Sequence, residues 1–236
     1  MSQWPDTTAV LIPAYKAADH LKDLLPRLLE SVPADHICVV DDASEDDTGT
    51  LCARFGITCL HHAVNQGKGA ALLTGFSRLS SETVKWIITM DADGQHSPDD
   101  LPAFITAANA TPAPGICIGA RSMKLGTMPP ERILSNRLTS GILSLFCGVK
   151  IIDSQCGYRM YSVAFLEKTS ITFQRFEMES EIIMKAAFLG FPVTFVPIQT
   201  LYLKGPSHIS HLTDTLRWIL AVINIRFRRK NLIASR

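Results

Sequence analysis

The sequence has no excess of charge of either sign. Its 23 lysine and arginine residues balance 22 aspartate and glutamate residues, which leaves a net charge of +1. Proteins that bind nucleic acid through general surface charge need a strongly basic face, so the composition gives no support for that class. Charged residues make up only 19% of the 236 residues and hydrophobic residues 47%, which excludes disorder over most of the chain and supplies a continuous core.

The sequence also lacks long hydrophobic runs. The most apolar stretch near its end, Leu216 to Ile225, contains Arg217 and Asn224 and is about half of the ~20 residues that a membrane span needs. The first residues, Met1 to Asp6, have neither the basic nor the apolar segment of a secretory signal. We therefore expect a cytoplasmic protein without a transmembrane helix.

No two cysteines form a CxxC pair. Zinc sites and disulfide-rich folds need closely or regularly spaced cysteines, and here they are scattered, mostly among apolar residues. The spacing predicts buried free thiols in a reducing compartment, at Cys38, Cys52, Cys59, Cys117, Cys147 and Cys156.

Short apolar runs alternate with segments of helical periodicity, which is typical of strands that cross a parallel sheet. The predicted strands are residues 9–12, 37–40, 58–60, 86–90, 116–119, 157–161 and 193–196. Helices are predicted between the first five strands and at about 132–147, 177–189 and 212–229. This order predicts an α/β fold with a Rossmann-like, mostly parallel central sheet flanked by helices.

No internal repeat and no linker rich in glycine, serine or proline divides the chain, so residues 1–210 are expected to form one domain. Residues 211–236 are expected to form an amphipathic basic helix and tail, which either belong to the same domain or dock on a membrane. The last 22 residues hold six basic side chains and no acidic one.

Gly67-Lys68-Gly69 invites comparison with nucleotide-binding loops, but it fails both common patterns. A P-loop needs glycine at position 62, which is histidine here, and serine or threonine in place of Gly69. A dinucleotide fingerprint needs glycine or alanine at position 72, which is leucine. Residues 65–69 are either a turn that opens a helix or a loop that covers a ligand.

Ligands of open α/β sheets bind beyond the carboxyl ends of the strands. The first strand runs into Pro13-Ala14-Tyr15, the second into Asp41-Asp42 and the fourth into Asp91-Ala92-Asp93. Because residues i and i+2 of an extended chain point the same way, Asp91 and Asp93 can face one hard cation whose other ligands are diphosphate oxygens. The sequence therefore predicts a metal and nucleotide site at this edge.

Seven short motifs follow one another along the chain: VLIPAY (10–15), VVDDASEDDT (39–48), NQGKGAA (65–71), MDADGQH (90–96), IGAR (118–121), DSQCGYR (153–159) and GPSH (205–208). Together they resemble the family 2 glycosyltransferases with a GT-A fold, and within that family the branch similar to dolichol-phosphate mannosyltransferase. Each motif alone is weak, but seven in the family's order are specific.

The resemblance implies a role for each matching residue. It places the nucleotide at Pro13, Ala14, Tyr15, Asp41, Asp42, Lys68 and Asp91, with Asp42 bonded to the base. It places a Mg²⁺ or Mn²⁺ ion at Asp91, Asp93 and Gln95, and the acceptor phosphate at Arg121, Arg132, Asn136, Ser207 and His208. Asp93, Arg121 and Asp153 are the implied catalytic residues.

Two departures from the family pattern concern the substrates. This branch usually continues Tyr-Asn-Glu, where the chain has Tyr15-Lys16-Ala17, which removes a carboxylate near the nucleotide and leaves GDP or UDP open. An arginine often precedes the Gly-x-Ser loop, where the chain has Tyr202 and Lys204, and His208 replaces a common lysine. A phosphate contact is therefore either lost or supplied by Lys204.

The resemblance implies an inverting transfer of a hexose from a nucleotide sugar, of the GDP-mannose or UDP-glucose type, to a polyprenyl or dolichyl phosphate. A saccharide or other hydroxyl acceptor remains open, with Asp153 as the general base. Two alternatives from other classes also remain, a sugar nucleotidyltransferase and a non-catalytic nucleotide-binding scaffold.

Several site residues also have a purely structural interpretation. Arg121 could pair with Glu131 at the surface, and Asp153 could cap the turn into Ser154. The acidic residues at 177, 179 and 181 are expected to favour a helix N-terminus. The histidines at 61, 62, 208 and 211 are expected to be polar surface residues and not a zinc site.

The predicted final helix carries an apolar arc wider than an ordinary core stripe, followed at once by Arg226-Phe227-Arg228-Arg229-Lys230. An apolar helix with a basic end suits the surface of an anionic bilayer and predicts peripheral docking at the inner face of the membrane. Alternatively, the helix closes the core or packs against a second copy of the chain. The arc consists of Leu212, Leu216, Trp218, Ile219, Leu220, Ala221, Val222, Ile223, Ile225 and Phe227.

Overall fold

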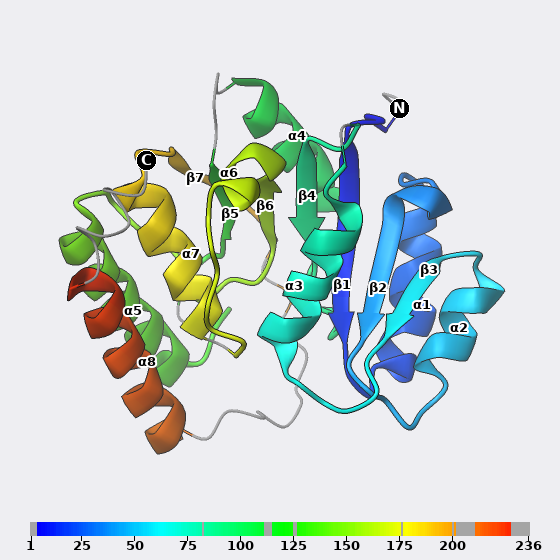
Figure 1. The fold of residues 1–236 in the computed structure, drawn as a ribbon, viewed down its shortest axis with the longest axis horizontal. Coiled ribbons are helices and arrows are strands. Elements are labelled where there is room, and N and C mark those ends of the chain that lie inside the picture. Colours follow the sequence, from blue (N-terminus) through cyan, green and yellow to red (C-terminus); the bar gives the residue numbers. More distant parts are fainter. Residues whose placement is uncertain are drawn as a thin grey trace.

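The computed structural model describes residues 4–81, 83–110, 115–124, 127–175, 177–199, 201 and 211–227. A central sheet of seven strands runs through them in the order β3-β2-β1-β4-β6-β5-β7, with helices on both faces (Figure 1). The strands are β1 (Thr8–Ala14), β2 (Ile37–Asp41), β3 (Thr58–His61), β4 (Trp86–Thr89), β5 (Ile116–Ala120), β6 (Arg159–Ser162) and β7 (Val193–Pro197).

The helices are α1 (Ala18–Leu29), α2 (Thr48–Arg54), α3 (Lys68–Leu79), α4 (Leu101–Ala110), α5 (Pro130–Cys147), α6 (Val163–Glu167), α7 (Glu177–Phe188) and α8 (His211–Phe227), with short 3-10 turns at Ala34–His36 and Pro98–Asp100. Every residue of β1 and β2 is buried, because helices cover both faces of the sheet. This explains why these strands read as continuous apolar runs in the sequence. The mostly parallel α/β fold predicted from the alternation is confirmed.

β6 is the one strand among the described residues that runs against the others. It lies between β4 and β5 and is antiparallel to both, with Thr89 opposite Arg159 at the carboxyl end of β4. The sequence pattern predicted a strand here but not its direction. Because β6 starts at the edge where the parallel strands end, the residues that lead into it, 153–158, come to the same edge.

The predicted element bounds agree with the observed ones to within two residues, but α6 and the two 3-10 turns were not predicted. The six cysteines are all free, as expected, although Cys59 and Cys147 are only half-buried. α8 packs its inner face on α7: Ala221, Val222 and Ile225 are buried, and the Trp218 indole N–H donates to Ser180 Oγ at 2.8 Å.

α3 approaches β1 closely because Gly75 has no side chain. A Cβ built on Gly75 would lie 2.2 Å from Cδ1 of Leu11, which is fully buried in the middle of β1. We expect Gly75→Ala to lower the free energy of unfolding by about 1–3 kcal/mol, because the core has no room for the methyl group. Urea denaturation measures the change.

Gly141→Ala is the matched control for Gly75→Ala. Gly141 also lies inside a helix, α5, but nothing stands within 4 Å of the Cβ position. Replacing glycine by alanine in an exposed helix raises stability by up to about 1 kcal/mol. A stabilising effect at both positions would show that α3 and β1 are not in tight contact.

Candidate active site

Four strand ends and the start of β6 bring polar side chains to one edge of the sheet, the lower edge in Figure 1. β1 ends at Ala14, β2 at Asp41, β4 at Thr89 and β5 at Ala120. The predicted residues 13–15, 41–42, 91–95 and 121 all lie within or just after these strand ends. The structure therefore gathers them as the sheet direction requires.

The turn after β1 joins the end of β2. The backbone N–H of Lys16 donates to Ser44 Oγ at 2.8 Å, and the Lys16 ammonium lies 5.5 Å from the centre of the Tyr15 ring. Lys16 has a φ of 51°, a left-handed conformation that lysine rarely adopts. The Tyr15 ring is half exposed, as a side chain that stacks on a ligand would be.

Asp41 and Asp42 are both buried and hydrogen-bonded. Asp41 accepts from the backbone N–H of Ser44 and from His61 Nδ1, each at 3.0 Å. Asp42 accepts from the backbone N–H groups of Gln66 at 2.9 Å and Gly67 at 2.6 Å. Asp42 thus holds the loop that opens α3, and its predicted bond to a nucleotide base stays a prediction.

His62 is not the surface residue that the sequence analysis expected. Its side chain is 9% exposed, and it donates from Nδ1 to Asp42 at 2.6 Å and contacts Thr74 Oγ1 through Nε2 at 2.9 Å. The correction has a simple cause: β3 ends beside β2, so the residue that follows β3 turns toward the carboxylate that follows β2. His61 is exposed, as expected.

Lys68, at the first position of α3, bridges two carboxylates. Its Nζ lies 2.7 Å from Asp91 Oδ1 and 2.8 Å from Glu179 Oε1. Burial by itself lowers the pKa of Lys68, but the two carboxylates outweigh it and raise this pKa above its ordinary value. For Asp91, burial by itself raises the pKa, but the charges of Lys68 and then His96 outweigh it and lower the pKa of Asp91 to about 2. Both groups are charged at neutral pH.

Asp91 and Asp93 have the chemistry of a site for a hard cation. Asp93 accepts from the backbone N–H of Gln95 at 3.0 Å and from its side-chain amide at 2.9 Å, so the amide oxygen of Gln95 is the atom left to serve as a ligand. A Cβ on Gly157 would lie 2.4 Å from Asp91 Oδ2, so only glycine leaves that oxygen accessible. Mg²⁺ and Mn²⁺ prefer such oxygen ligands.

Among the described residues, no three His, Cys, Asp or Glu side chains converge on one point as a self-contained metal site. A zinc site is therefore not found in that part of the chain. Two carboxylates and one amide oxygen suit an ion that completes its shell with substrate phosphates, as Mg²⁺ commonly does.

Arg121, at the end of β5, forms a two-point ion pair with Asp153. Arg121 Nε donates to Oδ2 at 2.8 Å and its NH2 group to Oδ1 at 2.9 Å, while Asn136 Nδ2 donates to Oδ1 at 2.6 Å. Arg121 pairs with Asp153 and not with Glu131, so the surface-pair interpretation is wrong. Asp153 also accepts from the N–H of Gln155 at 3.2 Å, as the turn interpretation expected.

The Asp153 carboxylate is fully enclosed by these partners. Its exposure is 0%; burial raises its pKa, but the hydrogen bond and charge of Arg121 outweigh this and lower the pKa below the ordinary value. A general base needs access to its substrate and a pKa near the working pH. Asp153 is therefore better suited to orienting Arg121 than to accepting a proton.

The structure supports the other predicted acceptor residues less directly. Asn136 is 1% exposed and donates to the buried Asp153 carboxylate, so its contact with an acceptor phosphate stays a prediction. Arg132 is half-buried in the first turn of α5. Ser207, His208 and Lys204 lie outside the described residues.

Two site residues escaped the sequence analysis, Glu179 and Arg159. Glu177 and Glu179 do begin α7, as expected, but Glu179 also pairs with Lys68 and, at 3.4 Å, with Arg159 NH2. Arg159 has 0% exposure and donates to the carbonyls of Ser154 and Cys156 at 2.8 and 2.7 Å. Arg159 is the last residue of the DSQCGYR motif, and Glu179 is one of the acidic residues expected at a helix N-terminus, but neither had been given a role in the site.

Comparisons with known proteins identify the class. The family described as "Glycosyl transferase family 2" matches residues 9–170, and this chain belongs to that family. The chain is 30% identical to the polyprenol monophosphomannose synthase of Mycolicibacterium smegmatis, covering 81% of this chain and 76% of the relative. It is 29% identical to the undecaprenyl-phosphate mannosyltransferase of Micrococcus luteus, covering 80% and 81%.

These relatives support the dolichol-phosphate mannosyltransferase-like branch. A further relative, from Methanococcus voltae, is UDP-N-acetylglucosamine–dolichyl-phosphate N-acetylglucosaminyltransferase, 27% identical over 82% of this chain and 85% of the relative. Among solved structures, the glucosyl-3-phosphoglycerate synthase of Mycobacterium tuberculosis with Mn²⁺, UDP-glucose and phosphoglyceric acid matches with a TM-score of 0.75. It is 14% identical, covers 94% of this chain and 80% of its own, and shows the shared GT-A fold.

His96 is a buried histidine at the site, and we expect it to make the stability of the fold depend on pH. Its ring is buried, stacks on Tyr158 at 4.9 Å and accepts a hydrogen bond at Nδ1 from the backbone N–H of Asp91 at 3.0 Å. Burial is the main cause that lowers the pKa of His96, although Asp91 and Asp93 act in the opposite direction. The folded state therefore takes up a proton at lower pH than the unfolded state does.

We expect this contribution to stability to be complete above the ordinary histidine pKa of about 6.5 and to be lost as the pH falls below it, by at most about 1.4 kcal/mol per pH unit. Urea denaturation at pH 7.5 and 5.5 measures the loss. In His96→Asn, whose side-chain oxygen can accept the Asp91 N–H, the loss should be smaller. An equal loss in the wild type and in this variant would contradict the assignment.

Proposed function

We propose that this glycosyltransferase moves a hexose from a nucleotide sugar to a polyprenyl phosphate, with inversion at the anomeric carbon. Three relatives carry names of enzymes that act on polyprenol, undecaprenyl phosphate or dolichyl phosphate, and they align over about four-fifths of this chain. A nucleotidyltransferase or a non-catalytic scaffold receives no support from these relatives.

One observation carries the proposal: the carboxylate pair of Asp91 and Asp93 and the guanidinium of Arg121 lie at the same edge of the sheet. The carboxylates suit a cation on the donor side, and the guanidinium suits an anionic acceptor. Burial lowers the pKa of Arg121, but the hydrogen bond and the charge of Asp153 outweigh this and raise the pKa above its ordinary value, so Arg121 is charged at neutral pH. Asp91 and Asp93 supply the cation ligands for the donor diphosphate. Arg121 supplies positive charge for the acceptor phosphate.

An acceptor phosphate needs no general base, because its second pKa of about 6 leaves it anionic near pH 7. An acceptor oxygen attacks the anomeric carbon from the face opposite the diphosphate, the new C–O bond forms, and the bond to the nucleoside diphosphate breaks. A bound Mg²⁺ or Mn²⁺ supplies charge stabilisation for the leaving diphosphate. Lys68, which is paired with Asp91, would add a further positive charge near the leaving diphosphate.

The enclosure of Asp153 favours this acceptor over a hydroxyl. A hydroxyl acceptor requires a group that takes its proton, and Asp153, the residue predicted for that task, is buried and committed to Arg121 and Asn136. The choice between GDP and UDP depends on the surroundings of Tyr15 and Lys16, and both nucleotides therefore belong in any donor screen.

We expect turnover of a nucleotide sugar with a short polyprenyl phosphate to fall by at least about 100-fold in Asp93→Ala, because the cation and the diphosphate lose a ligand. The measurement is a screen of GDP- and UDP-sugars with Mn²⁺ or Mg²⁺, with the lipid-linked sugar detected by mass. Asp23→Ala, an exposed position of α1 that is not among the predicted site residues, is the control and should keep wild-type turnover.

Turnover in Asp93→Ala equal to that of Asp23→Ala would contradict the metal assignment. Transfer to a free saccharide in place of the lipid phosphate would contradict the acceptor. Absence of nucleotide binding to the wild-type chain would contradict the glycosyltransferase activity as a whole.

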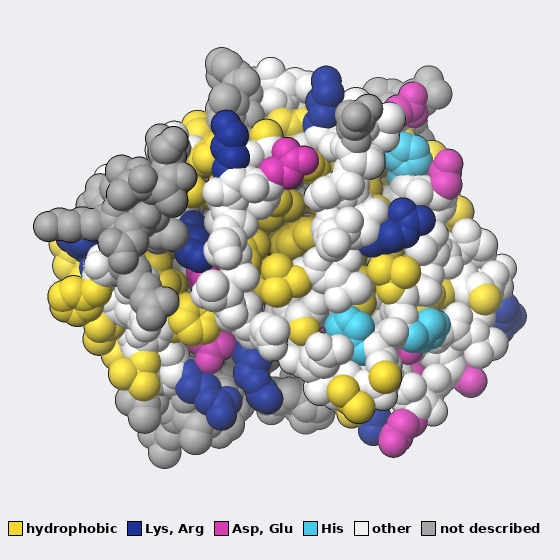
Figure 2. Space-filling view, in the orientation of Figure 1, with side chains coloured by type: hydrophobic (Ala, Val, Ile, Leu, Met, Phe, Trp, Pro, Cys, Tyr) yellow, Lys and Arg dark blue, Asp and Glu magenta, His cyan; other side chains and the backbone are white. Residues whose placement is uncertain are grey.

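We also propose that α8 contacts the membrane that holds the acceptor. In the described residues no helix is long and apolar enough to cross a bilayer. α8 nevertheless exposes Leu220, Ile223 and Phe227 at helical spacing, while its opposite side packs on α7. The exposed basic residues Arg217 and Arg226 lie on the same helix. The two expectations for this helix, core packing and an exposed apolar stripe, are thus both met by α8. In Figure 2, hydrophobic side chains gather on the left side of the molecule, where Figure 1 shows α8.

We expect the protein to sediment with anionic vesicles at low salt, and Phe227→Glu to reduce the bound fraction several-fold, because the change places a negative charge at the lipid surface. Val64→Glu is the matched control, since Val64 is a similarly exposed apolar residue far along the chain from α8. Equal recovery with neutral and anionic vesicles, or equal loss in both variants, would count against docking through α8.

A further inference from the structure

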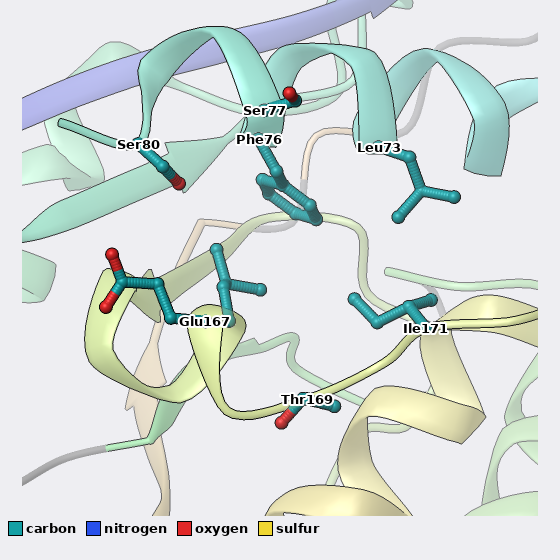
Figure 3. A pocket seen from close by; sticks show the side chains of 8 residues that line it. Leu73, Phe76, Ser77, Ser80, Glu167, Thr169 and Ile171 are labelled. Carbon is teal, nitrogen blue, oxygen red and sulfur yellow. The ribbon is translucent and has the colours of Figure 1, made fainter.

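Residues 169–175, called the strap below, connect α6 to α7 and cross the start of α3. One end of the strap borders a cavity of about 200 Å³, lined on one side by α3 and on the other by α6 and the strap (Figure 3). Ile171 faces the α3 residues Leu73 and Phe76 across this cavity. It is only partly buried against the hydrophobic core, so side-chain packing at this end of the strap is incomplete.

A buried ion pair on α7 holds the middle of the strap. Glu181 has 0% exposure, and its carboxylate accepts from the backbone N–H groups of Thr172 at 3.0 Å and Phe173 at 2.9 Å, and from the Thr172 hydroxyl at 2.6 Å. Lys185, one turn further along α7, pairs with Glu181 at 2.6 Å and donates to the Ser170 carbonyl. Two charged side chains thus bind the backbone of Ser170, Thr172 and Phe173.

The other end of the strap lies against the start of α3. The carbonyl of Gln174 accepts from the backbone N–H of Ala70 at 3.2 Å. A Cβ on Gly69 would lie 2.4 Å from the carbonyl carbon of Gln174, so the two backbones are in direct contact. A Cβ on Gly67 would lie 3.3 Å from the oxygen of the same carbonyl, and the φ of Gly67 is +97°, which favours glycine. Side chains at these two positions would therefore crowd the strap.

Lys68 lies between these two glycines, so the strap determines where its side chain begins. Its ammonium must reach Asp91 and Glu179 at 2.7 and 2.8 Å together, which leaves little tolerance for a shift of the α3 start. Glu179 is one half-turn before Glu181 on α7, so one helix supplies both a partner of Lys68 and the group that holds the strap.

We propose that Glu181 is a positioning residue for the donor site: through the strap and Gly69 it sets the place of Lys68 beside Asp91. The proposal rests on the proposed function, because it treats Lys68 as part of the site for the donor diphosphate. Glu181 itself contacts the strap and Lys185 and none of the predicted metal or nucleotide residues. Its effect on the donor is therefore indirect.

The test compares three variants of the full chain: Glu181→Gln, which keeps the shape but removes the charge; Gly69→Ala, which pushes the strap away and leaves Glu181 and Lys185 intact; and Gly141→Ala, an open position on α5. Calorimetry with Mn²⁺ and UDP or GDP gives nucleotide affinity. Hydrogen exchange gives the protection of the Ala70 amide, with the Val10 and Leu11 amides of β1 as an internal reference.

We expect Glu181→Gln and Gly69→Ala each to weaken nucleotide binding by about 10-fold to 100-fold, the range typical for residues that hold a ligating group in place. Exchange at Ala70 should accelerate in both while β1 keeps its protection, and Gly141→Ala should change neither. A loss of general stability alone would not produce this local pattern, because β1 would then lose protection as well.

Unchanged nucleotide affinity in both variants, or unchanged exchange at Ala70, would overturn the positioning role while leaving the proposed function intact. If Glu181→Gln does not fold, Gly69→Ala decides, since it leaves the buried pair in place. If the wild-type chain binds neither UDP nor GDP, the proposed function and the donor role of Lys68 are both overturned. Faster exchange at Ala70 in the variants would then show only that Glu181 holds the strap against the start of α3.

Discussion

A fully buried guanidinium, that of Arg159, is the constraint on which the site depends. Water cannot reach its N–H groups, so each must find an acceptor within the protein. The acceptors are the carbonyls of Ser154 and Cys156 on the incoming loop, and the carbonyl and carboxylate of Glu179 on α7. One side chain therefore ties the start of β6, the loop before it and the first turn of α7 together.

The consequence is a site built from paired, partly buried charges. The loop held by Arg159 carries Asp153 to Arg121 and places Gly157 against Asp91. The carboxylate held by Arg159 in turn meets Lys68. Charges that the fold already holds in fixed pairs need little reorganisation when charge develops nearby, which is the electrostatic property that contributes most in enzyme sites. α8 and the strap belong to the same arrangement, because both pack on or bind to α7.

The sequence predicted the parts of the site that follow directly from a strand end. Asp91 and Asp93 could be assigned because extended residues two apart share a direction, and Arg121 because the motif that ends β5 resembles the family's. His62, Glu179, Arg159 and Glu181 could not be assigned, since their partners are distant in the chain. Lys68 and Glu179 are 111 positions apart, and no local pattern relates them.

The alternation of apolar runs and helical periodicity by itself determined the α/β class, the element bounds and the edge at which the candidate site lies, because each depends on neighbours within a few residues or on the common direction of parallel strands. Only the tertiary structure decided that β6 runs antiparallel between β4 and β5, that Asp153 is enclosed by Arg121 and Asn136, and that α8 has both a packed and an exposed apolar side. These outcomes depend on burial and on pairing between distant segments. Burial removes water as the partner of a charged group, and folding alone determines which distant group replaces it.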